Sequence, residues 1–276
     1  MNFMVHGKST YHHEMKSHRP WLNLVALLTV LLTGHAASTA ESTTNGFKFD
    51  DFLLVPLRFH LLSAKDAPQL ATTLTEKDIA RILGKMNGVW AQAGVHFYRE
   101  SLVQEEADKQ ELYSEPSRQA NLEWVLELRP TATKGERVFD LYYLKQMKPN
   151  GVYFPAGIFV KDTASLKKVE GGIDEPLPRV SSHELGHALS LPHRQSMTNL
   201  MASGTTGTAL NAEEIAQARA AARKFDWIES APALLKQADD FYRAKKTKEA
   251  RALYERLASL PLKTGPVEKA RKRVGR

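Results

Sequence analysis

The sequence predicts an α+β fold for the main part of this 276-residue chain. Residues 52–62 (FLLVPLRFHLL) read as a strand, and residues 75–94 repeat apolar side chains at helical spacing. Further strand-like stretches follow at 138–144 and on both sides of Pro155. Strands and one long helix are therefore expected to form a mixed domain.

The individual elements follow from local signals along the chain. In the long helix, Ile79, Ile82 and Met86 fall on one face, and Gly94 is expected to end it. A short strand, VHFYR, comes next, and the acidic run 100–115 is expected to be a solvated loop or helix. The stretch LNAEEIAQARAAARKF predicts a later helix, for which Asn211 is a suitable N-cap.

The N-terminal segment has the layout of a signal peptide covering residues 1–40. An apolar run at 21–33 follows three basic side chains and precedes small residues, so cleavage is expected after Ala40. The run is shorter than the about 20 residues of a membrane span, although an uncleaved segment would act as an anchor. The chain contains no cysteine, and secretion without disulfides favours a bacterial periplasmic or extracellular protein.

The segment HELGHALSLPH contains three histidines within eleven positions. A chain of this composition would show that spacing by chance only about once in a thousand cases. On a helix, His183 and His187 lie on the same face and can bind one metal ion, with Glu184 beside them. Six residues correspond to a rotation of about 240°, so the chain must leave the helix after Leu189 and fold back to bring His193 to the metal.

Three histidine ligands leave the fourth position of a zinc ion open, as in catalytic sites. The segment resembles the metzincin signature, in which these histidines bind Zn²⁺, the glutamate activates a water, and a Met-turn follows. Met201 matches the Met-turn methionine, whereas Ser190 stands where the pattern has glycine. Either Ser190 takes a left-handed conformation, or the helix ends differently, with Pro192 making the break.

The resemblance implies a metzincin-like domain over residues 41–230. It would contain a twisted, mostly parallel sheet with one long backing helix, an active-site helix and a small C-terminal subdomain. The implied activity is that of a secreted zinc endopeptidase, in which Glu184 activates a zinc-bound water. The expected partner is a protein or peptide substrate, held along GVYF (151–154) as an added strand.

Residues 231–276 are expected to form a separate basic helical hairpin. Two apolar stripes in this segment predict two helices, which resemble one tetratricopeptide unit. Residues 233–276 contain thirteen basic and five acidic side chains, so the net charge of +7 for the chain arises in this tail. Nucleic-acid binding is therefore not expected. The hairpin either packs on the protease domain or serves an anionic surface or protein partner.

Two alternatives to the leading interpretation remain open. A gluzincin-like peptidase would use His183 and His187 with a downstream carboxylate, for which Glu213 and Glu214 are candidates. A binding module would keep the metal and act through its C-terminal helices, although the intact Glu184 argues against this.

Overall fold

The computed structural model describes residues 49–114, 121–130 and 137–275. The predicted signal peptide, residues 1–40, lies outside the described residues. Within the described ranges, no helix combines the length and the apolar character needed to cross a membrane.

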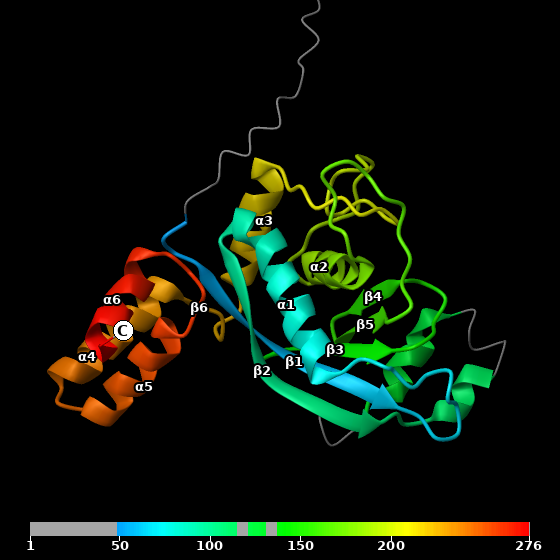
Figure 1. Cartoon of the computed structure of the whole chain (residues 1–276), viewed down its shortest axis with the longest axis horizontal. Coiled ribbons are helices and arrows are strands. Elements are labelled where there is room, and N and C mark those ends of the chain that lie inside the picture. Colours follow the sequence, from blue (N-terminus) through cyan, green and yellow to red (C-terminus); the bar gives the residue numbers. More distant parts are fainter. Residues whose placement is uncertain (1–48, 115–120, 131–136, 276) are drawn as a thin grey trace, which may run out of the picture. The chain divides into compact units, whose positions relative to one another are not determined.

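The centre of the fold is a six-stranded, mostly parallel sheet in the order β2-β1-β3-β5-β4, with β6 paired to β1 (Figure 1). Parallel pairing joins β1 to β2 and β3, and β3 to β5, whereas β4 and β6 pair antiparallel. The strands are β1 (Leu53–Ser63), β2 (Val95–Glu106), β3 (Phe139–Leu144), β4 (Gly151–Phe154), β5 (Gly157–Lys161) and β6 (Glu229–Ser230). The short strand β4 is therefore an edge of the sheet.

The helices are α1 (Glu76–Trp90), α2 (Pro176–Ala188), α3 (Ala212–Ala222), α4 (Ala231–Arg243), α5 (Thr247–Ala258) and α6 (Gly265–Val274). Short 3₁₀ helices lie at Ala91–Ala93, Gln110–Ser114 and Leu122–Leu128. The structure is thus a mixture of helices with a mostly parallel sheet, as the sequence predicts.

Helices α1 and α2 share a hydrophobic core with one face of the sheet. The core includes alternate residues of β1, among them Leu53, Val55 and Leu57, together with Trp90 of α1 and Leu185 of α2. Alternation along a strand sends the intervening side chains to the other face, where a second cluster forms around the 3₁₀ helix Leu122–Leu128. The helix α2 is thereby held firmly against α1 and β4.

The helix α1 begins where the sequence predicts, but it ends at Trp90 rather than at Gly94. Thr75 caps its N-terminus in a capping box with Asp78. The 3₁₀ helix Ala91–Ala93 follows, and Gly94 ends it with a φ of 60°, a left-handed conformation that glycine adopts without steric cost. The chain then turns directly into β2.

The strand β2 is longer than predicted, and the expectation of a loop or helix from Glu100 onward is wrong for its first seven residues. The strand continues to Glu106 and pairs with β1 over its whole length, with an irregularity between Leu57 and Arg58. Backbone pairing with the buried strand β1 therefore outweighs the polar composition of this stretch.

Three helices, rather than the predicted two, follow β6. They are α4, α5 and α6, here called the three-helix unit (residues 231–274). Their buried side chains form a cluster that also contains Phe52 and Leu54 of the β1 region. In addition, Arg256 of α5 donates hydrogen bonds to Tyr98 Oη (2.9 Å) and to Glu229 (2.8 Å). The three-helix unit therefore packs on the start of the sheet.

Candidate metal centre

The helix α2 carries the first two histidines of the motif and ends as a Schellman motif. The N–H of Leu191 donates to Gly186 O (2.8 Å), and the N–H of Ser190 donates to His187 O (2.9 Å). Ser190 has a φ of 67°, in the left-handed region. The sequence left open whether Ser190 takes a left-handed conformation or the helix ends differently at Pro192. The structure has Ser190 in the left-handed conformation. This turn reverses the chain toward the metal centre.

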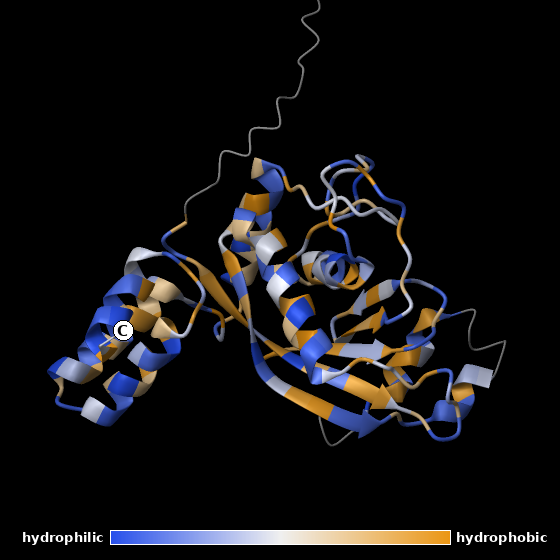
Figure 2. Cartoon of the chain, viewed as in Figure 1, coloured by the Kyte–Doolittle hydropathy of each residue, from blue (hydrophilic) through white to orange (hydrophobic). Residues whose placement is uncertain are grey.

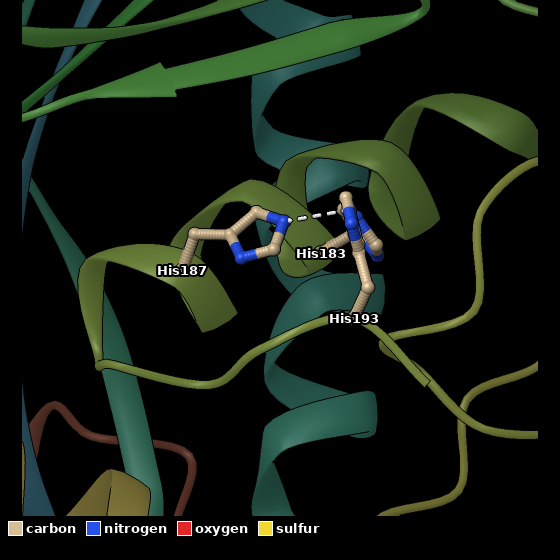
Figure 3. Close-up of side chains that lie close together, drawn as sticks. All are labelled: His183, His187 and His193. Atoms are coloured by element: carbon tan, nitrogen blue, oxygen red, sulfur yellow. Dashed lines mark hydrogen bonds between the residues drawn. The ribbon is translucent and has the colours of Figure 1, made fainter. Parts of the chain in front are cut away.

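The reversal brings His193 beside His183 and His187. One nitrogen from each ring lies within 4.8 Å of the others, and the Nε2 atoms of His187 and His193 are 3.1 Å apart (Figure 3). Nitrogens bound tetrahedrally at the usual zinc distance are about 3.3 Å apart. The three imidazoles therefore have the composition and spacing of a metal-binding group.

Backbone carbonyls orient two of these rings. His183 Nδ1 lies 2.8 Å from Leu200 O, and His187 Nδ1 lies 2.8 Å from Leu191 O. A protonated Nδ1 donates to the carbonyl, which leaves the lone pair of Nε2 free for a metal. Burial lowers the pKa of His183 to about 3 and also lowers that of His187. Both rings are consequently neutral at neutral pH, the state that binds metal.

Glu184 is buried beside the histidines, with 6 % of its surface exposed. Burial raises the pKa of its carboxyl group to about 8, while the Arg179 guanidinium and the backbone N–H of Tyr153 act in the opposite direction. A Cβ atom at Gly151 would lie 2.7 Å from Glu184 Oε1. Only glycine therefore lets the edge strand β4 pass this closely over the carboxylate.

Met201, the residue expected at a Met-turn, packs against Gly186 of α2. Its side chain is fully buried, and its Sδ atom occupies the space where a Cβ of Gly186 would be. Its backbone N–H donates to Asn199 Oδ1 (2.7 Å), and its carbonyl accepts from the N–H of Arg194 (3.0 Å). The segment that follows His193 is thus tied to the methionine turn.

Glu214 is not a metal ligand, so the gluzincin-like arrangement has no support in the geometry. Its carboxylate is fully buried and accepts hydrogen bonds from Arg194 Nε (2.6 Å), Asn199 Nδ2 (2.8 Å) and the backbone N–H of Asn211 (2.9 Å). Glu213 is exposed on α3 and lies outside the metal-binding group. Glu214 instead joins α3 to the segments on both sides of the methionine turn.

Arg179 is a residue of the site that the motif alone did not reveal. It lies one helical turn before His183, is 2 % exposed, and donates to the carbonyls of Gly207 (3.1 Å), Asn199 (3.4 Å) and Ala202. A buried guanidinium with these acceptors fixes the loop after Met201 against α2. The spacing of four residues from His183 was the available signal in the sequence.

A cavity of about 430 Å³ opens over the histidines and Glu184. The edge strand β4 forms one wall, and the loop after the methionine turn contributes Ser203 and Gly204. The remaining lining residues are Leu122, Pro149, Asn150, Leu166, Arg179 and Val180. An extended chain laid along β4 would therefore pass over the metal-binding group.

No family model and no curated protein matches this chain. Among solved structures, it is similar to archaemetzincin from Methanopyrus kandleri, with 15 % sequence identity and a TM-score of 0.42. The similarity covers 61 % of this chain and 96 % of the archaemetzincin chain. A similarity of this degree does not establish a function for the chain.

Proposed function

We propose that the chain is a secreted zinc-dependent endopeptidase that uses Glu184 as its general base. The observation that carries the proposal is the convergence of three imidazole nitrogens within 4.8 Å, beside a buried glutamate in an open cavity. Three nitrogen donors, with no fourth ligand among the described residues, suit a catalytic rather than a structural zinc site. The hard oxygen ligands that Ca²⁺ or Mg²⁺ require are not in this group.

Glu184 and the strand β4 have different roles in the proposed peptide hydrolysis. When bound, Zn²⁺ would supply a Lewis acid that polarises the scissile carbonyl and acidifies a water. Glu184 takes the proton of the attacking water on its carboxylate and delivers it to the leaving amine. Burial raises the pKa of Glu184, so its carboxylate, once deprotonated, is a stronger base than an exposed glutamate. The unpaired edge of β4 holds the substrate as an additional strand.

Secretion is proposed from the N-terminal segment alone. Its apolar run at 21–33 and the small residues before position 41 have the order of a cleavable signal peptide. Expression of the full chain in a bacterium, followed by N-terminal sequencing of the exported protein, should give a chain that begins at Glu41. A chain that keeps its N-terminus and sediments with membranes would instead be anchored.

The activity is tested with the full chain and its Glu184→Gln variant. Both proteins should bind one zinc ion, and only the unchanged chain should cleave a mixed peptide library. Glu213→Gln, which alters an exposed carboxylate of α3, is the matched control and should cleave normally. Equal cleavage by the Glu184→Gln variant would contradict the mechanism, and absence of zinc from all three proteins would contradict the metal site.

A further inference from the structure

We propose that the three-helix unit binds an acidic polypeptide segment at one of its ends. This end is formed by the turn between α4 and α5 and by the last turn of α6. It carries Lys245, Lys246, Lys248, Lys272 and Arg273 and is called the cationic end below. The proposal is independent of the peptidase activity, because the metal centre contributes none of these residues.

Two ring contacts show that the segments of the cationic end lie together. The Arg273 guanidinium of α6 lies 5.4 Å from the ring centre of Tyr242 in α4, and Lys246 Nζ lies 5.7 Å from that of Phe241. A cavity of about 310 Å³ opens between the three helices at this end. It is lined by Tyr242, Thr247, Ala250, Arg251, Tyr254, Arg273 and Val274.

The charges of the cationic end are not neutralised within the described part of the chain. Five other basic side chains of the three-helix unit form ion pairs: Lys236 and Arg243 with Asp240, Arg251 with Glu255, Arg256 with Glu229 and Arg271 with Glu268. Among the described residues, no carboxylate lies within 4.0 Å of the five cations of this end. Hydrophilic residues also dominate α5 and α6 in Figure 2. Uncompensated positive charge around a cavity favours an anionic partner.

The shape of this end favours a polypeptide over a lipid surface. Helices that bury themselves in a membrane interface insert a row of apolar side chains between lipids, in addition to any electrostatic attraction to anionic headgroups. Among the described residues, the only large hydrophobic side chains with high exposure are Tyr242 and Met197, and Arg273 lies over the Tyr242 ring. A cavity with arginine and tyrosine side chains instead suits carboxylates on a flexible chain, which guanidinium groups bind in a bidentate manner.

Lys245 provides a further observation at this end. It ends α4 with a φ of 60°, a conformation that favours glycine or asparagine. Replacement by glycine therefore removes the backbone strain together with one positive charge. Lys245→Gly should raise the melting temperature and weaken binding of the acidic partner, so that stability and binding change in opposite directions.

The test uses the full chain with Glu184→Gln, so that the probe is not cleaved. The probe is a fluorescent peptide of alternating glutamate and alanine, and its binding is followed by anisotropy. Lys246→Glu with Lys248→Glu should weaken binding at least about tenfold at low salt. The matched control is Lys224→Glu with Lys263→Glu, which reverses two exposed lysines outside the cationic end and should change binding less than about twofold.

Three results would overturn the proposal. The first is an equal loss of binding in the control pair, which would show a general effect of net charge. The second is no binding of the peptide by the unchanged cationic end at low salt. The third is tighter binding to phosphatidylglycerol vesicles than to the peptide, with the same dependence on Lys246 and Lys248, because the partner would then be a lipid surface.

Discussion

At the scale of single residues, the metal centre depends on a few side chains with unusual conformations or surroundings. The motif predicts the three histidines, and the structure brings them together. The spacing from the histidines also singles out Met201, and it shows that Ser190 stands where the motif has glycine. The hydrogen bonds of Arg179 to carbonyls and those of Glu214 could not be predicted, because the partners lie 15 or more residues away in the sequence, apart from the cap at Asn211.

Ser190 gives the first prediction. Because its φ is 67°, Ser190→Gly should relieve steric strain, whereas Ser190→Ala should keep it. Urea denaturation should show the glycine variant to be more stable than the alanine variant by about 1 kcal/mol. Peptide cleavage should survive in both. Equal stability of the two variants would show that the left-handed turn carries no strain.

Glu214 gives the second prediction, which distinguishes a residue that positions the segment after His193 from one that binds the metal itself. Glu214→Gln replaces an acceptor by donors that face Arg194 and Asn199, and should destabilise the metal-free protein by about 2–4 kcal/mol. Zinc affinity should fall about tenfold, because the segment after His193 loses its anchor. Glu213→Gln should change neither property. Loss of zinc without loss of metal-free stability would instead identify Glu214 as a ligand.

At the scale of elements, the sequence predicts those helices and strands whose limits depend on neighbouring residues in the chain. The apolar spacing predicts the buried face of α1, and Gly94 ends the 3₁₀ helix that follows it. Asn211 is the N-cap of α3, as predicted, and also forms a capping box with Glu214. The second half of β2 was missed because its pairing with β1 is a long-range interaction. The helix α6 was missed because it is short and highly charged, and its Val267 and Ala270 are buried by packing on α4 and α5.

The third prediction concerns His96 on β2. Burial lowers the pKa of His96 to about 4, against 6.5 for an unperturbed histidine. The unfolded chain therefore binds a proton at a higher pH than the folded chain. The contribution of neutral His96 to the free energy of unfolding, about 3 kcal/mol, is fully present above pH 6.5. It is lost as the pH falls from 6.5 through 4.

The comparison with His96→Gln isolates this contribution, since the variant cannot titrate at this position. Urea denaturation at a series of pH values should show a smaller loss of stability for the variant between pH 6.5 and 4. Parallel curves for the two proteins would show that His96 is accessible to protons in the folded state.

At the scale of the whole chain, the metal centre and the three-helix unit use separate sets of residues. Every residue of the metal-binding group precedes Ser230, whereas the three-helix unit buries Phe52 and Leu54 of the sheet. A chain ending after Ser230 should therefore bind zinc with unchanged affinity. Its melting temperature should fall, because apolar surface at the start of β1 becomes exposed. An unchanged melting temperature would show that the three-helix unit does not support the sheet.

The central claim is that three histidines hold a zinc ion with one position open for catalysis. X-ray absorption at the zinc edge tests it most directly, on the full chain with one equivalent of zinc. Three imidazole nitrogens and one non-protein oxygen are expected at about 2.0–2.1 Å from the zinc. Two imidazoles with a carboxylate ligand, or a shell of oxygen atoms alone, would contradict it.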